Sequence, residues 1–234
     1  MATRITVLQP SYIPWLGYFD QIKKSDIFVF YDDVLYTKND WRNRNRIKTE
    51  KGTAWLTIPV DIKNRLTNHL LIKEAAITNN QILKKHLKTI EISYKDSPFF
   101  ENVYSIISPL FTTEYRLLAD LDIDLVKTIS EYIEIKNVSF LRSSDMNVVN
   151  ENPTQRLIDI CKKLNATHYL TGASAKNYLD EAVFKKNDIL LEYQEYKHPT
   201  YKQQWGDFVP YLSIIDLLFN EDKRSLDILS NKYE

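Results

Sequence analysis

The sequence predicts an α/β protein with a mainly parallel, Rossmann-like sheet flanked by helices. Apolar runs typical of buried strands alternate with helical patterns near both ends of the chain. The runs at 5–8 and 26–31 are joined by one helix, and such units give parallel strands with a right-handed crossover. Helical periodicity predicts a block at about 80–135 that packs on the sheet or is inserted into it. No repeat or linker divides the chain, so we expect one domain over 1–234.

Short apolar patterns predict the elements of the first half. The run at 5–8 predicts a buried strand, and apolar residues at helical spacing predict a helix at 15–24. The run at 26–31 predicts a second strand. Residues 54–60 predict a third, whose end lies at an edge or an exit because Pro59 cannot donate to a ladder. A polar loop is expected at 63–68, followed by a short strand or an irregular return at 70–77.

The second half is helical first and then alternates. Ser97-Pro98 separates two helices within the helical stretch at 80–132. Pro153 stands just before the periodic residues 155–164, where proline in the first turn favours a helix. The remaining apolar runs predict strands at 138–141, 168–171 and 188–193 and a buried helix at 212–219.

Composition limits the classes of function. Lys+Arg and Asp+Glu both number 31, so the net charge is zero and no overall positive field attracts nucleic acid. An anionic ligand must therefore be bound by a local cluster of cations. Charges interrupt every apolar run, so we expect no membrane span. Cys161 is the single cysteine, and with no signal sequence at 1–4 it points to a soluble protein of the reducing cytoplasm. No spacing of His, Cys and Asp indicates a metal site.

The loop after the first strand is rich in proline, glycine and aromatic residues. In parallel sheets ligands bind beyond the carboxyl ends of the strands, and aromatic faces there can stack on a base or a sugar. The alternative is that Pro10 and Pro14 only stiffen a turn while Trp15 fills the core. The candidate binding residues of this loop are Gln9, Pro10, Tyr12, Trp15, Gly17 and Tyr18.

Two further segments offer anion-binding side chains. The stretch 41–48 combines a tryptophan with arginines and asparagines, which suit bidentate binding of phosphate and orientation of sugar hydroxyls. The alternative is a solvated turn anchored by Trp41. A lysine after the Gly/Ser turn at 172–176 could also meet a phosphate, though this signal is weak alone. The candidates from both segments are Trp41, Asn43, Arg44, Asn45, Arg46, Gly172 and Lys176.

Two residues are candidate proton acceptors. Asp32 follows the second strand, where it could bind a ribose, a metal or an amine, or act as a base; an aspartate there is also a common turn former. His86 lies on the apolar face of its predicted helix, where histidine is more often a hydrogen-bonded core residue. If an amine is acylated, Asp32 or His86 would accept its proton.

Several motifs together identify a family. They are the stretches 9–19, 26–29 with Asp32, 41–45, 55–60, 169–172 with Tyr178, Tyr201 with Gln203, and 212–220. At these residues, over nearly the whole chain, the sequence resembles the WbqC-like family. Members look like proteins encoded among genes for bacterial O-antigen and other surface polysaccharides. The resemblance implies acyl or aminoacyl transfer to a nucleotide-linked amino-deoxy sugar, with polysaccharide pathway enzymes as partners, and it adds Tyr178, Tyr201 and Gln203 to the binding candidates.

A more distant similarity is to nucleotidyltransferases and pantothenate-synthetase-like ligases, which also begin with a strand, a Pro-containing loop, a glycine and a helix. Such ligases activate a carboxylate with ATP and pass it to an amine, so ATP or an acyl donor is the implied cofactor. Their early motif carries histidines, whereas this chain has Ser11-Tyr12 and Gly17-Tyr18. That departure favours the alternative of a non-catalytic nucleotide- or sugar-binding partner of a pathway enzyme, while polar side chains at two strand ends favour an enzyme.

Overall fold

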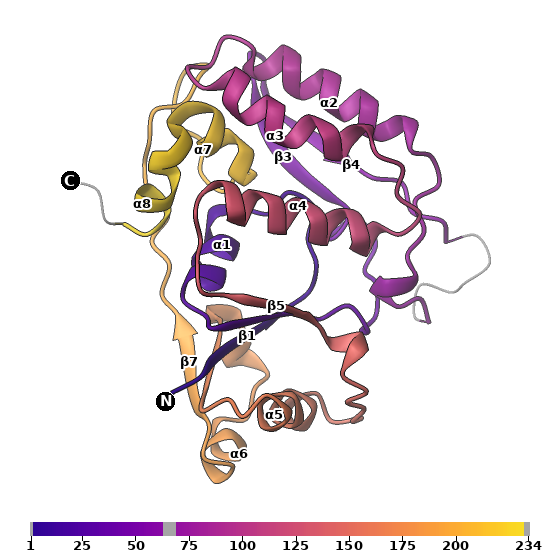
Figure 1. The fold of residues 1–234 in the computed structure, drawn as a ribbon, viewed down its shortest axis with the longest axis vertical. Coiled ribbons are helices and arrows are strands. Elements are labelled where there is room, and N and C mark those ends of the chain that lie inside the picture. The colour runs from indigo at the N-terminus through magenta and orange to yellow at the C-terminus, as the bar shows by residue number, and fades with distance from the viewer. Residues whose placement is uncertain (1, 63–68, 232–234) are drawn as a thin grey trace.

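The α/β class is confirmed by the computed structural model, which describes residues 2–62 and 69–231 (Figure 1). Its helices and strands are β1 (Arg4–Leu8), α1 (Leu16–Lys23), β2 (Ile27–Phe30), β3 (Arg44–Thr49), β4 (Gly52–Thr57), η1 (Ile72–Glu74), α2 (Gln81–Tyr94), α3 (Phe100–Thr112), α4 (Leu118–Tyr132), β5 (Ser139–Arg142), η2 (Ser143–Asp145), α5 (Pro153–Lys163), β6 (His168–Gly172), η3 (Ala173–Asn177), α6 (Glu181–Lys186), β7 (Leu190–Gln194), α7 (Ile214–Glu221), η4 (Asp222–Arg224) and α8 (Ser225–Leu229). The η elements are short 3-10 helices. The predicted polar loop at 63–68 lies outside the described residues.

The main sheet is parallel and is centred on β1. Within the described residues it has five strands in the order β5-β2-β1-β6-β7. Ile5 of β1 lies opposite Ile27 of β2 on one side and Tyr169 of β6 on the other. Along the chain, β2 and then β5 are placed on one side of β1, and β6 and then β7 are placed on its other side. The carboxyl ends of β1 and β6 therefore form a topological switch point, where sheets of this kind open a crevice for ligands.

Helices cover both faces of the sheet. In Figure 1, α1 and α4 lie on one face, and α5 and α6 lie on the other. Alternate side chains of β2 point to opposite faces of the sheet. Phe28 and Phe30 pack in the core with α1 and α4, whereas Val29 packs in the core with α5 and α6. The strand period of two thus produces two separate apolar cores. Among the described residues, no helix has the length and apolar character that crossing a membrane would require.

The basic stretch after Trp41 forms a strand, a conformation that differs from the turn weighed on sequence grounds. β3 pairs antiparallel with β4 in a separate two-stranded sheet. Asn45 and Ile47 are buried, while Arg44 and Arg46 are half-buried on the opposite face. This alternation is typical of a strand with one covered face. The turn that joins the strands ends at Gly52, whose φ of 105° lies in the region that favours glycine.

The long excursion between β2 and β5 carries the hairpin and the helical stretch. α2, α3 and α4 fall within residues 80–135, and β2 and β5 pair directly although this stretch separates them. The segment at 70–77 is an irregular return rather than a strand. It contains η1 and makes isolated bridges from Leu71 to Leu35 and from Ile77 to Val60.

Candidate functional site

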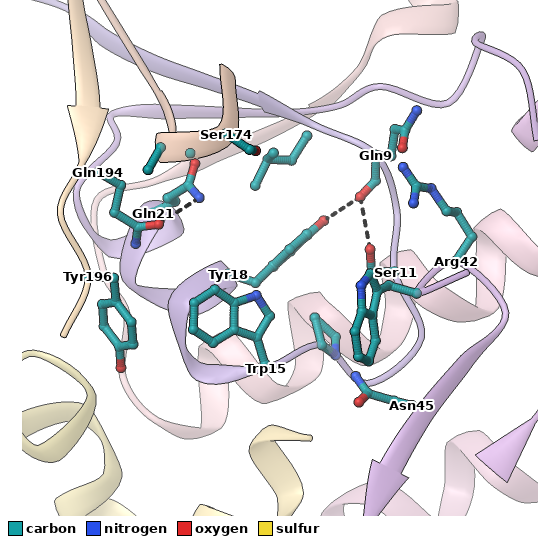
Figure 2. Close-up of a pocket in the computed structure, with 15 residues that line it drawn as sticks. Gln9, Ser11, Trp15, Tyr18, Gln21, Arg42, Asn45, Ser174, Gln194 and Tyr196 are labelled. Atoms are coloured by element: carbon teal, nitrogen blue, oxygen red, sulfur yellow. Dashed lines mark hydrogen bonds between the residues drawn. The ribbon is translucent and has the colours of Figure 1, made fainter. Parts of the chain in front are cut away.

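A pocket of about 490 Å³ opens over the switch point. Its walls come from the end of β1, the following loop, α1, the segment before β3, and the chain after β6 and β7. Figure 2 shows the rings of Trp15 and Tyr18 between Gln194 and Tyr196 on one side and Gln9 on the other. The lining residues are Leu8, Gln9, Ser11, Pro14, Trp15, Tyr18, Gln21, Trp41, Arg42, Asn45, Gly172, Ala173, Ser174, Gln194 and Tyr196.

The loop after β1 is held by the base of the β3–β4 hairpin. The Nδ2 atom of Asn45 donates to the carbonyl oxygens of Tyr12 at 3.3 Å and Ile13 at 2.9 Å. The backbone N–H of Tyr12 donates to the Trp41 carbonyl at 3.0 Å. Ile13 has a φ of 37°, which a β-branched residue adopts only under strain. Asn45 therefore acts first as a clamp on the loop, and it also reaches the pocket wall.

Trp15 and Tyr18 form the aromatic floor of the pocket. A Cβ atom at residue 17 would lie 2.3 Å from the Trp15 ring, so only glycine lets the indole fold over the first turn of α1. The edge of Tyr196 meets that indole at a ring distance of 5.3 Å. The Tyr18 hydroxyl donates to the Gln9 carbonyl at 3.1 Å, and burial raises the Tyr18 pKa, so this phenol stays protonated.

One wall is made of glutamine amides. Nε2 of Gln21 donates to Oε1 of Gln194 at 2.9 Å, and Nε2 of Gln194 donates to the Gly17 carbonyl and to Asp20. Both donors of the Gln194 amide are therefore taken by protein partners. Oε1 of Gln21 is buried and accepts no hydrogen bond from the described residues. An unpaired buried acceptor costs free energy, so this oxygen is an unsatisfied polar atom beside the pocket.

Arg42 is the one charged side chain among the described residues that line the pocket. Its Nη1 atom pairs with Asp40, while Nε is buried without a partner and no described residue accepts from Nη2. Burial lowers the Arg42 pKa, and Asp40 opposes that shift. The guanidinium thus keeps donors for an anionic ligand.

Asp122 of α4 lies in the core near Arg42, Tyr12 and Tyr18. It is fully buried, and neither carboxyl oxygen has a hydrogen-bond partner among the described residues. Burial raises the pKa of Asp122 well above its usual value, and the charge of Arg42 opposes the shift only in part. Burial therefore favours the neutral form of this carboxyl group.

The structure brings six predicted binding residues into the pocket wall. They are Gln9, Trp15, Tyr18, Trp41, Asn45 and Gly172. Gly17 lies under the Trp15 ring, and Pro10 is buried in the same segment. Tyr12 points away from the pocket, since its hydroxyl meets Nδ1 of His86 at 2.9 Å inside the core.

Other predicted residues of the basic segment lie outside the pocket. The Arg44 guanidinium lies 4.4 Å from the centre of the Trp55 ring, and that of Arg46 lies 5.6 Å away. Trp41 lies beside the same ring at 5.7 Å, so this cationic face begins at the pocket rim. Asn43 is buried and donates to the Ile58 carbonyl at 2.8 Å, which ties β3 to the segment after β4.

The later predicted residues lie in separate places. Lys176 has its Nζ atom 5.0 Å from the Tyr193 ring, outside the pocket. The Tyr201 hydroxyl and Nε2 of Gln203 both donate to Oδ2 of buried Asp216, at 2.9 and 2.8 Å. These two side chains anchor the loop before α7. Tyr178 is exposed and lines a second cavity near the same switch point.

Neither candidate proton acceptor lines the pocket. Asp32 is fully buried and accepts from Nε of Arg142 at 2.7 Å and from the backbone N–H of Ser144 at 3.0 Å. His86 is buried in the core, where desolvation lowers its pKa to about 4. Catalysis by Asp32 or His86 stays a prediction, and their surroundings indicate that each stabilises the fold. No group of three or more His, Cys, Asp or Glu side chains in the described part of the chain is placed to hold a metal ion.

Sequence reasoning missed several lining residues. Arg42 belongs to the basic segment 41–48, which the sequence marked as anion-binding, but it was not among the predicted binding residues. Gln21 and Gln194 are 173 residues apart and carry no motif, so no local pattern marks them. The missed polar and aromatic residues are Ser11, Gln21, Arg42, Ser174, Gln194 and Tyr196.

Comparison with known proteins places the chain in a family. The model of the WbqC-like protein family matches residues 9–228, which include every lining residue of the pocket except Leu8. The chain belongs to the WbqC-like family. This WbqC-like chain is 38% identical over 228 residues to the uncharacterized protein Rv1507c of Mycobacterium tuberculosis (strain ATCC 25618 / H37Rv), and the match covers 97% of each chain. No solved structure gives a significant match.

A first prediction concerns Asp32 of this WbqC-like protein. The change Asp32→Ala leaves the donors of Arg142 and Ser144 unpaired, so we expect it to lower the free energy of unfolding by about 2–4 kcal/mol. The control is Asp145→Ala, an exposed aspartate in η2, which should change stability by less than about 0.5 kcal/mol. Urea unfolding measures both. An unchanged midpoint for Asp32→Ala would contradict a structural role.

A second prediction concerns buried Asp122. Because its folded-state pKa is raised, its contribution to stability is complete below about pH 4 and declines as the pH rises toward the folded pKa. Asp122→Asn has no proton to lose. We therefore expect its stability relative to wild type to increase above about pH 4, by up to about 1.4 kcal/mol per pH unit. Denaturation curves between pH 4 and 8 measure this difference, and a difference that does not vary with pH would contradict it.

Proposed function

We propose that this WbqC-like protein binds a nucleotide-linked amino-deoxy sugar in the pocket and transfers an acyl or aminoacyl group to its amine, in the synthesis of O-antigen or another surface polysaccharide. The observation that carries the proposal is the make-up of the wall. Aromatic rings alternate with side-chain amides, and Arg42 supplies one cation with free donors. The family membership agrees with this pathway.

The neutral part of the wall suits a sugar and a base. Trp15, Trp41 and Tyr196 offer faces and edges on which rings can stack. The unpaired Oε1 of Gln21 can accept a hydrogen bond from a hydroxyl or an amine of the sugar. A volume of about 490 Å³ falls in the range of small-molecule sites.

The charged part suits phosphate. Arg42 pairs with Asp40 through Nη1 only, so its remaining donors can hold one phosphate of a nucleotide. Beyond the rim formed by Trp41, the guanidinium groups of Arg44 and Arg46 continue the positive surface over Trp55. A ligand with more than one phosphate could follow this path out of the pocket.

The reaction would form a bond between the amine nitrogen and the acyl carbon, while the bond from that carbon to its leaving group breaks and the amine loses a proton. The described residues of the pocket wall include no aspartate, glutamate or histidine, and Tyr18 keeps its proton. The wall therefore binds and orients, and the proton passes to solvent or to the leaving group. Activation of the donor with ATP is compatible with such a site, because phosphoryl and adenylyl transfer depend mainly on positioning and charge.

The lack of an aspartate, glutamate or histidine among the described lining residues favours a second candidate function. A pocket that binds a sugar nucleotide without a base on its wall could belong to a non-catalytic protein that presents the ligand to another polysaccharide pathway enzyme. Turnover distinguishes the two. Formation of an N-acylated product by the purified chain with ATP and a carboxylate, or with an acyl thioester, would establish the enzyme; binding without product for any donor would favour the partner.

The proposal predicts the binding behaviour of two substitutions. Arg42→Gln removes the phosphate contact, so we expect the Kd for nucleotide-linked amino sugars and for the nucleoside diphosphate to rise about tenfold or more. Gln21→Leu removes the free acceptor, so it should weaken binding of the amino sugar nucleotide but not of the nucleoside diphosphate alone. Isothermal titration calorimetry measures each affinity.

The control for these titrations is Arg224→Gln, a highly exposed arginine at the end of η4. It removes the same charge at a distance from the pocket and should leave each Kd unchanged. The proposal is wrong if no nucleotide-linked amino sugar binds the wild type, or if Arg42→Gln binds as tightly as wild type does.

A further inference from the structure

A second cavity of about 380 Å³ opens beside the first at the switch point. Both cavities are lined by Leu8, Gln9 and Arg42 at the carboxyl end of β1. The second cavity lies on the opposite face of the sheet, because its residues Val7 and Leu157 belong to the core under α5 and α6. Trp15 and Tyr18 of the first pocket pack against the other core. Ligands in the two cavities would meet only at the end of β1.

The walls of the second cavity differ from those of the first. Tyr31, Tyr169 and Tyr178 surround it together with Leu157 and Pro153, whereas the first pocket combines tryptophans with glutamine amides. Such a lining suits a ligand with an apolar or aromatic body. Within the described residues, no aspartate or glutamate lines this cavity.

Among the described residues that line the second cavity, Arg42 is the one cation, and the neighbouring Arg156 is paired with Asp33. Arg156 lies 5.0 Å from the Tyr31 ring, but its Nη2 atom is paired with Asp33 at 2.6 Å. Arg42 is bonded to Asp40 through Nη1 alone, and its Nε and Nη2 atoms donate to no described residue. The first turn of α5, which begins at Pro153 on the cavity wall, also favours negative charge. A carboxylate is therefore the anion that fits beside an apolar body here.

We infer that the second cavity is the subsite for the donor acid, a small carboxylic acid with an apolar or aromatic body whose carboxylate binds Arg42 and is then activated with ATP, so that phosphate or AMP leaves the acyl carbon when the amine attacks it. This inference rests on the proposed function, because the first pocket then holds the amine acceptor. Arg42 stands between the cavities and keeps two donor atoms, Nε and Nη2, that no described residue uses. One guanidinium would therefore contact both the nucleotide phosphate and the carboxylate, which it holds at the edge of the acceptor site. A simple acid fits better than an amino acid, because an ammonium group would find no acidic partner on this wall.

Three related compounds test the chemistry of the subsite on the full-length protein. They are 3-phenylpropanoate, its uncharged amide 3-phenylpropanamide, and L-phenylalanine, which adds an ammonium group to the acid. We expect the acid to bind about tenfold or more tightly than either of the others. Saturation-transfer difference NMR and calorimetry measure the affinities. Equal binding of the amide, stronger binding of phenylalanine, or no binding of the acid would overturn the inference.

A matched pair of exposed aromatic residues tests the location. Tyr178 is 67% exposed and lines only the second cavity, whereas Trp41 is 46% exposed and lines only the first, so neither truncation threatens folding. We expect Tyr178→Ala to weaken binding of 3-phenylpropanoate about fivefold and Trp41→Ala to change it less than about twofold. The reverse pattern would place the acid in the first pocket and overturn the inference.

The same two variants separate this inference from the proposed function. A nucleotide-linked amino sugar should lose affinity in Trp41→Ala and keep it in Tyr178→Ala. If the wild type binds the acid with the expected pattern but no sugar nucleotide, the donor subsite stands and the proposed acceptor is wrong. If it binds the sugar nucleotide but not the acid, the acceptor site stands and the donor subsite is wrong.

Discussion

The hydrogen bonds from the Asn45 amide to the loop after β1 are the interaction on which the crevice depends. They satisfy two carbonyl groups of a loop that holds Ile13 in a left-handed conformation, where a β-branched residue is strained. The same contact fixes the hairpin against the end of β1. Trp41 and Arg42, which precede the hairpin, thereby become walls of the crevice. One buried amide thus links a strand of the small sheet to the ligand edge of the large one.

Burial sets the charge of the groups around this clamp. His86 is neutral at about pH 7 because burial lowers its pKa to about 4, and burial raises the pKa of Asp122, which favours the neutral form of that carboxyl group. Tyr18 also keeps its proton. Arg42 therefore carries the one charge on the wall of the first pocket within the described chain, and Asp40 occupies only Nη1 of its guanidinium. Such an arrangement binds and orients an anion more readily than it moves a proton.

The switch point explains why two different cavities lie so close together. β1 and β6 are neighbours, but the chain leaves them toward opposite faces of the sheet, so each face opens its own space. The face with α1 carries amides and indoles, and the face with α5 carries tyrosines and aliphatic residues. Arg42, which precedes β3, lines both cavities beside the end of the central strand.

Apolar periodicity in the sequence predicts the five strands of the parallel sheet, most helix positions and the α/β class, because such periodicity is a local property of the chain. It also marked the segments that supply Gln9, Trp15 and Trp41 to the pocket, since ligand sites follow the ends of parallel strands. The packing of distant elements places Arg44 and Arg46 on the outer face of β3, buries Asp32 and His86 away from the pocket, and brings Gln21 to Gln194. These outcomes depend on contacts between elements up to 173 residues apart, which no local pattern encodes.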